Sequence, residues 1–162
     1  MKTTLRIATL LVFIITIGSS ANARPMASWP YDKLTADADL IVIATPTSVK
    51  DTGKKTELPG GIRMTGDDNI PRPIPAIAME ATFEVLSVLK GEAKGKEFIF
   101  HYLRQDPPPT MPIINGAGLV TFDPNKKERY LLFLRRQPEG GFSSLTGQID
   151  PIQGIKELGT YP

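Results

Sequence analysis

The chain has 162 residues, with 19 lysines and arginines against 17 aspartates and glutamates, a single histidine and no cysteine. The absence of cysteine excludes thiol catalysis, disulfide exchange and cysteine-ligated metal sites. With one histidine, a zinc site would depend on carboxylates, which zinc seldom accepts as its main ligands, so no metal or other cofactor is expected.

Residues 1–23 have the pattern of a secretory signal peptide. Lys2 and Arg6 lead into the apolar run "IATLLVFIITIG", which is shorter than the roughly 20 residues that a membrane-spanning helix needs. Ala21 and Ala23 then form an A-x-A cleavage site, so cleavage is expected between Ala23 and Arg24, with a cut after Ala21 as the alternative. The length disfavours an uncleaved anchor, so the protein is predicted to be secreted or periplasmic, with no membrane span after processing.

Removal of this segment balances the charge of the chain. Lys2 and Arg6 are its two charged residues, which leaves 17 basic and 17 acidic residues in residues 24–162. Binding to nucleic acid needs a clustered positive surplus, so nucleic acid is not an expected partner. The remaining length suits a single domain over 24–162.

The first predicted elements are a short helix and a buried strand. Ser28 is a candidate cap and Pro30 stands near the first helical position, so a helix is predicted over Pro30 to Ala36. Trp29 is expected to pack the short segment that precedes this helix onto the domain. The β-branched run "LIVIATPTSV" over residues 40–49 predicts a buried strand. Pro46 is expected to mark a bend or an edge in it.

Residues 50–75 look different from both neighbours. They contain four glycines, four prolines and many charges without any hydrophobic period. Irregular loops longer than about 12–15 residues within compact domains are usually functional or disordered. The sequence therefore predicts a long loop, whose candidate partner-binding residues are Ile62, Arg63, Met64, Arg72 and Ile74. The alternative for this loop and for the proline-rich one below is an insertion that the fold merely tolerates.

An antiparallel strand pair is predicted next. Apolar side chains alternate from Ile77 to Val85, after which the phase moves to Leu86 and Val88. Such a slip requires a bulge or sharp bend, which we expect near Leu86. The charged turn "KGEAKGKE" leads into the strand "FIFHYL", residues 98–103, where His101 is expected to be structural.

A second irregular stretch covers residues 104–118 and includes "DPPPTMP". Successive prolines hold an extended backbone, so this loop is also a candidate binding surface, through Pro108, Met111 and Ile113. Further strands are predicted at 119–122, at 129–136 and in "GFSSLTG", and the tail is expected to lie over one end. Five or six strands and one short helix predict an all-β barrel or sandwich.

The sequence carries few signs of catalysis. The patterns GxSxG, GxGxxG and GxxxxGK[ST] are absent, and Ser143 and Ser144 are expected to be ordinary strand hydroxyls. The acidic pairs at 37/39 and 67/68 lack calcium-loop spacing, so solvated acids are favoured there. Paired carboxylates of a hydrolase depend on spatial separation and stay open, but a non-catalytic function is favoured.

Three phrases, in their order and spacing, resemble the netrin-like module of the tissue inhibitors of metalloproteinases. They are "ADADLIVIATPTSV", "FEVLSVLKGE" and "KKERYLLFL" followed by a glycine turn, and they span residues 36–141. The resemblance implies a five-stranded OB-fold barrel in which the loop over 50–75 joins the first two strands. In those inhibitors, that loop helps to contact the enzyme.

The inhibitors also chelate the protease zinc through an N-terminal cysteine, whereas this chain would begin with Arg24 and Pro25 and has no cysteine. The resemblance therefore carries the fold and not the chelating mechanism. The function predicted is an exported, non-catalytic module that binds another protein, with a protease-inhibitor-like domain as one form of it. The alternatives are a carboxylate-based hydrolase of the cell envelope and a structural subunit of an envelope assembly.

Overall fold

The computed structural model describes residues 28–65, 68–109, 118–149 and 151–160. The predictions on Ala21, Ala23, Arg24, Met111 and Ile113 fall outside these residues. The elements in chain order are α1 (Tyr31–Asp37), β1 (Leu40–Glu57), β2 (Arg63–Thr65), β3 (Pro71–Pro73), β4 (Pro75–Lys90), β5 (Glu97–Gln105), the 3-10 turn η1 (Pro124–Lys126), β6 (Glu128–Arg136), β7 (Phe142–Ser144), the 3-10 turn η2 (Pro151–Gln153) and β8 (Ile155–Thr160).

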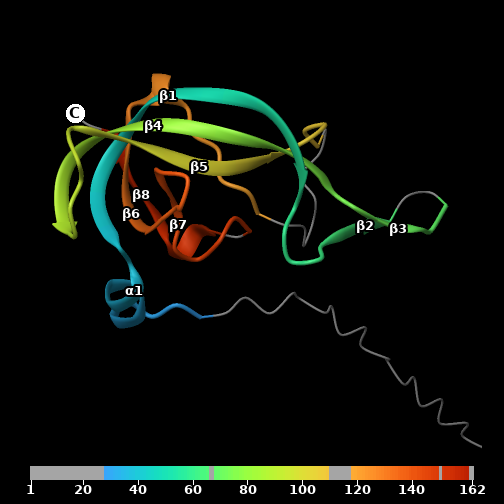
Figure 1. The fold of residues 1–162 in the computed structure, drawn as a ribbon, viewed down its shortest axis with the longest axis horizontal. Helices are drawn as coiled ribbons and strands as arrows, with labels where there is room; N and C mark the ends of the chain where they lie inside the picture. The colour runs from blue at the N-terminus through green and yellow to red at the C-terminus, as the bar shows by residue number, and fades with distance from the viewer. Residues whose placement is uncertain (1–27, 66–67, 110–117, 150, 161–162) are drawn as a thin grey trace, which may run out of the picture.

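Six of the strands form one sheet that closes into a ring. The strand order is β1-β4-β5-β7-β6-β8, and β1 also pairs with β6, which joins the two sides of the sheet (Figure 1). β2 and β3 form a separate two-stranded sheet. The prediction of an all-β fold with one short helix is confirmed, and none of the helices in the described ranges is long and apolar enough to cross a membrane.

The predicted strand pair is present in the ring. β4 runs antiparallel to β5, with Phe83 opposite Phe98 and Ala76 opposite Gln105. Because alternate side chains of a strand face opposite sides, Ile77, Met79, Ala81 and Phe83 all point into the ring and are buried.

Aromatic rings fill the centre of the core. Phe83 is fully buried and stacks on Phe98 at 5.5 Å between ring centroids. It also meets Phe100, Phe122 and Tyr130 edge-on, at 5.9, 4.9 and 6.2 Å. Edge-to-face and offset contacts at these distances add to the stabilisation from burial alone.

Two predictions about strand irregularity are also confirmed. The register between β1 and β4 shifts between Ile43 and Ala44, whose partners are Ser87 and Val85, so Leu86 is the extra residue of a bulge. A second shift follows Pro46, which cannot donate a ladder hydrogen bond. The bulges let one long strand change the face that it presents to the core.

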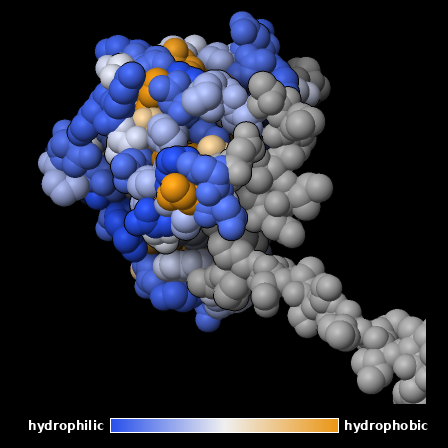
Figure 2. All heavy atoms as spheres, turned by 90° about the vertical axis from the view of Figure 1, so that its right-hand side faces the viewer, coloured by the Kyte–Doolittle hydropathy of each residue, from blue (hydrophilic) through white to orange (hydrophobic). Residues whose placement is uncertain are grey.

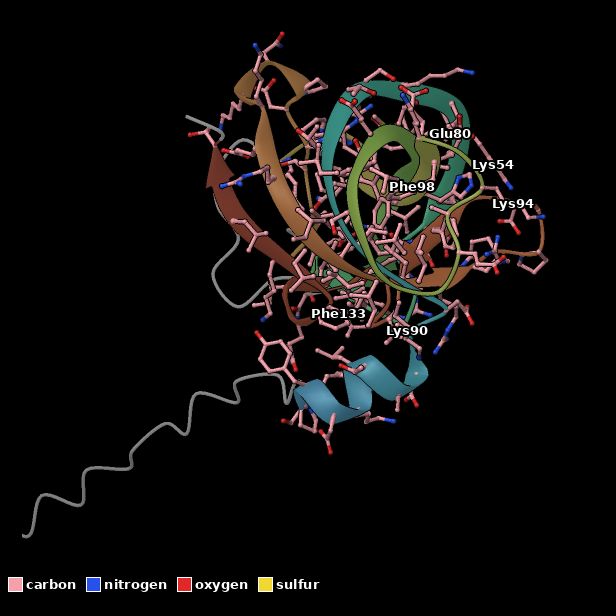
Figure 3. The ribbon with its side chains drawn as sticks, turned by 90° about the vertical axis from the view of Figure 1, so that its left-hand side faces the viewer. Lys54, Glu80, Lys90, Lys94, Phe98 and Phe133 are labelled. Carbon is pink, nitrogen blue, oxygen red and sulfur yellow. The ribbon has the colours of Figure 1, made fainter. Side chains whose placement is uncertain are left out.

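A junction of α1, β1 and the β4–β5 turn closes one end of the ring. The Lys90 ammonium donates to the carbonyl oxygens of Thr35 and Ala36, at 2.6 and 2.9 Å, and so caps the last turn of α1. The Asp39 carboxylate accepts from the N–H of Arg136 at 2.8 Å. Figure 3 shows Lys90 directed toward the helix.

The structure corrects several local predictions. Pro30, not Ser28, is the N-cap of α1, and no side chain caps it, although Trp29 packs on the body as expected. Residues 119–122, predicted as a strand, form no ladder, although Phe122 is buried in the core. The tail contributes β8, which pairs with β6, and β1 continues to Glu57 through the residues predicted as loop.

Candidate protein-binding surface

The part of the chain predicted as the first long loop is an ordered projection over most of its length. β2 pairs antiparallel with β3, with Met64 opposite Arg72, and this hairpin projects from one end of the ring (Figure 1). We call the described residues between Leu58 and Ile74 the arm.

The base of the arm is held by an apolar latch. The N–H of Leu58 donates to the carbonyl oxygen of Ile74 at 2.9 Å, and both side chains are buried, at 5% and 6% exposure. They form a small cluster with Ala76, against which further half-buried side chains pack: Ile62, Leu103, Leu119 and Ile149. The latch fixes both ends of the arm to the ring, independently of the main core.

The outer part of the arm carries exposed apolar side chains on a braced backbone. Met64 is 48% exposed and Ile70 is 53% exposed. The Arg72 guanidinium meets both carboxylate oxygens of Asp68, one of them at 3.1 Å. Hydrogen bonds from Arg72, and then from the backbone N–H of Ile70, lower the pKa of Asp68 from its ordinary value.

A second brace lies where β1 leaves the ring toward the arm. The Asp51 carboxylate accepts from the N–H of Gly53 and from the Arg104 guanidinium of β5, both at 2.7 Å. These hydrogen bonds, that of Gly53 first, lower the pKa of Asp51. Gly53 has a φ of +71° and lies where the β1–β4 register shifts between Asp51 and Lys55, so the brace forms at a bulge.

The structure sorts the residues predicted for partner contact. Arg63, Met64 and Arg72 are exposed on the arm, whereas Ile74 belongs to the latch, so its part is to anchor the arm. Ile62 is half-buried at the base. Figure 2, which faces this side, shows a mostly hydrophilic surface with isolated apolar residues.

The described part of the second predicted loop begins next to the arm. Pro108 and Pro109 line a hollow of about 280 Å³ together with Leu103, Arg104 and Leu119. Leu103 and Leu119 also pack on the latch of the arm. The two predicted loops therefore start from the same end of the ring.

Truncation of the latch is expected to release the arm without unfolding the ring. Leu58→Ala removes buried methyl groups from a small cluster, which costs about 2–5 kcal/mol in well-packed sites. Amide hydrogen exchange is expected to accelerate in Ile62–Thr65 while exchange in β4 and β5 stays slow. Equal acceleration throughout the ring would show that the arm and the ring fold as one unit.

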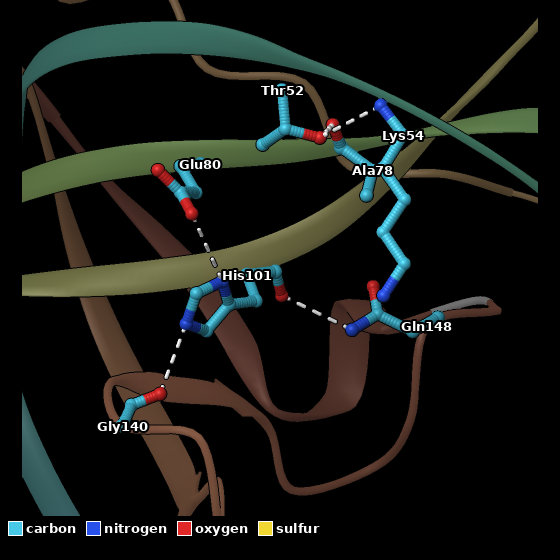
Figure 4. A network of polar contacts seen from close by, with 7 residues as sticks. All are labelled: Thr52, Lys54, Ala78, Glu80, His101, Gly140 and Gln148. Atoms are coloured by element: carbon cyan, nitrogen blue, oxygen red, sulfur yellow. Dashed lines mark hydrogen bonds and ion pairs between the residues drawn. The ribbon is translucent and has the colours of Figure 1, made fainter.

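His101 has structural partners, in line with its prediction. Its Nε2 lies 3.0 Å from the Gly140 carbonyl oxygen, and its Nδ1 lies 3.9 Å from a carboxylate oxygen of Glu80 (Figure 4). The Gln148 amide donates to the His101 carbonyl oxygen at 3.1 Å. A Cβ on Gly141 would lie 2.6 Å from Nε2, so the imidazole of His101 fits closely under the β6–β7 turn.

The hydroxyl groups of Ser143 and Ser144 also have hydrogen-bond partners within the fold. The Ser143 hydroxyl accepts from the Gln137 amide, and the Ser144 hydroxyl shares a hydrogen bond with Thr146. Burial raises the pKa of Tyr102 to about 12. No group of three or more metal-binding side chains occurs within the described ranges.

The most informative signal that the sequence reading missed is the pairing of Leu58 with Ile74. Each is an isolated apolar residue beside a proline, in a segment rich in charge and glycine. Their separation in sequence hides the contact from any test of local periodicity.

Comparisons of the chain with protein-family models, with curated proteins and with solved structures each find no match.

Proposed function

We propose that the chain is an exported, non-catalytic module that binds another protein through the arm. One observation carries the proposal: a buried latch of Leu58 and Ile74 supports an outer segment whose apolar side chains, Met64 and Ile70, are exposed. Apolar side chains exposed on a fixed backbone contribute contact area to an interface.

The construction of the arm suits tight binding. Ordering a flexible loop on binding consumes part of the interaction free energy, so a segment held in its bound shape binds better. In β3, Pro71 and Pro73 fix φ, and the Arg72–Asp68 ion pair ties β3 to the residues that precede it. The arm thus loses little conformational entropy when a partner covers it.

The arrangement of three sequence phrases supports a netrin-like OB-fold. The phrases that resemble the metalloproteinase inhibitors meet at one junction, since the N–H of Asp39 donates to the Leu134 carbonyl oxygen and Gly91 packs against the Asp39 carbonyl. The arm also occupies the place of the inhibitor loop, between the first two long strands of the ring. Extracellular proteases are therefore the first partner class to test, by a mechanism that does not use zinc chelation by cysteine.

The proposal predicts that partner binding depends on the outer arm. The chain and its double variant Met64→Ser, Ile70→Ser serve as baits for the exported proteome, and the captured proteins are purified. Loss of two apolar contacts is expected to raise the dissociation constant of a true partner by about tenfold or more. Isothermal calorimetry with the purified partner measures the change.

A matched control comes from β8. Leu158 is 43% exposed and lies on another element, so Leu158→Ser removes a comparable apolar side chain away from the arm. It is expected to leave the affinity unchanged. Equal capture and equal affinity for the chain and the arm variant would reject the arm as the binding surface.

The hydrolase alternative has little support in the described residues. Glu84 and Glu97 line a shared hollow with Lys94 and Lys96, but both carboxylates are exposed. A general acid needs burial or a close like charge to hold its proton near neutral pH.

A further inference from the structure

In the last residues of β4, one backbone edge of the strand has no ladder partner in the described residues. β5 pairs with β4 from Ala76 to Glu84, and the N–H of Val85 donates to the Lys96 carbonyl oxygen at 2.8 Å. Beyond Val85, the described residues provide β4 with ladder partners on the β1 side alone. An unpaired edge presents N–H and C=O groups in the geometry that a further strand would use.

The side chains along this edge are apolar, whereas the exposed edges of most sheets carry features that prevent pairing. Leu86, Val88 and Leu89 are 44%, 44% and 57% exposed. Leu86 and Leu89 are the bulge residues that have no partner on β1. Exposed strand edges usually carry charges, prolines or bulges that prevent pairing. This edge has the bulges at Leu86 and Leu89, but between Glu84 and Lys90 it has neither a charge nor a proline.

The segment is complementary to itself in the antiparallel direction. When "EVLSVLK", residues 84–90, is paired with a second copy about Ser87, Glu84 faces Lys90. The same register places Val85 opposite Leu89 and Leu86 opposite Val88. Apolar and oppositely charged cross-strand pairs stabilise an antiparallel ladder, whereas like charges destabilise it.

Lys90 is able to take part in this pairing while it caps α1. Its ammonium donates two hydrogen bonds, to Thr35 and Ala36, and the group has three hydrogens. The third is available to the Glu84 carboxylate of a second copy.

We infer that the chain forms a two-fold symmetric dimer in which residues 84–90 of β4 pair antiparallel with the same residues of a second copy. The contact is isologous, so it closes at two chains and does not propagate into a filament. Lys90 and Lys94 lie at this end of the ring (Figure 3), and the arm projects from the opposite end (Figure 1). The dimer would therefore leave both arms accessible, so one assembly could hold two partner molecules.

The charge pairs provide a direct test. Glu84→Lys and Lys90→Glu each place like charges opposite one another in a homodimer, so each is expected to weaken dimerisation by about tenfold or more. When the two variants are mixed, every charged pair is again attractive, and a heterodimer is expected. Analytical ultracentrifugation of the protein as the cell processes it, with the variants alone and mixed, measures the masses.

Leu158→Lys is the control, because it also introduces a lysine, at an exposed leucine of another edge strand, and it is expected to leave the dimer intact. Circular dichroism checks that each variant is folded. A monomeric parent chain, or a mixture of folded variants that stays monomeric, would overturn the inference.

A second variant keeps the test decisive if Lys90→Glu disturbs α1. The chain has no cysteine, so Ser87→Cys introduces a single thiol, which meets its counterpart on the two-fold axis. Opposed residues of an antiparallel pair lie about 4.5–5.5 Å apart at Cα, which a disulfide spans.

Air oxidation is expected to convert Ser87→Cys to a covalent dimer and to leave Ser48→Cys, an exposed serine of β1, monomeric. Failure of Ser87→Cys to cross-link, or equal cross-linking of both variants, would contradict pairing about Ser87. A dimer that forms but resists Glu84→Lys would locate the interface elsewhere.

Discussion

Phe83→Ala is expected to remove a large share of the stability of the protein. Phe83 is fully buried and touches four other aromatic rings, from β5, β6 and the segment before η1. Truncation of a buried phenylalanine costs about 3–5 kcal/mol, against a total free energy of unfolding of about 5–15 kcal/mol in typical domains. Urea denaturation followed by circular dichroism measures the loss as a lower midpoint.

Ile152→Ala is a suitable control for this prediction. Ile152 is 61% exposed, and surface substitutions usually change the free energy of unfolding by less than about 0.5 kcal/mol. A similar midpoint for both variants would show that the strands do not close around a single aromatic core.

Gly91→Ala is expected to have the second largest effect, because two penalties meet at this position. Gly91 has a φ of +80°, and a Cβ there would lie 2.2 Å from the Asp39 carbonyl oxygen. A left-handed backbone costs a non-glycine residue roughly 1–3 kcal/mol, and forced overpacking costs roughly 1–3 kcal/mol more. Urea denaturation is expected to show a loss larger than either penalty alone.

Gly95 in the same turn separates the two penalties. Its φ is +106°, but a Cβ there would meet nothing within 4 Å. Gly95→Ala therefore carries the backbone penalty without the clash, and it is expected to be clearly milder than Gly91→Ala. If the two variants were equally stable, the close approach of Gly91 to Asp39 would not contribute to the junction.

Local patterns in the sequence were sufficient to predict much of the ring. The period of two in β4 identified the core-facing side chains from Ile77 to Val85, of which Val85 is half-buried, and the phase slip located the bulge at Leu86. Both features depend on the alternation of neighbouring side chains along one strand. Their physical cause is local, so the sequence displays it directly.

Features that depend on distant contacts were missed or misplaced. β8 has a weak pattern of its own and is a strand because β6 offers it an edge. Residues 119–122 have a strand-like composition but no ladder, although Phe122 packs in the core. Tertiary packing overrides local propensity at such positions.

The candidate binding site was predicted in part. The sequence located the segment and its exposed residues Arg63, Met64 and Arg72, because a charged, proline-rich stretch is typical of a surface loop. It did not predict the hairpin of β2 and β3 or the latch between Leu58 and Ile74. That contact joins residues on either side of the arm, and neither residue alone distinguishes an anchored arm from a flexible linker.

Hydrogen exchange in the presence of a captured, purified partner tests the central claim most directly. The account predicts slower exchange at the amides of Ile62 to Thr65, Ile70 and Arg72 when the partner is bound, with little change in the core strands. Unchanged exchange throughout these amides, with protection on another face of the ring, would contradict binding through the arm.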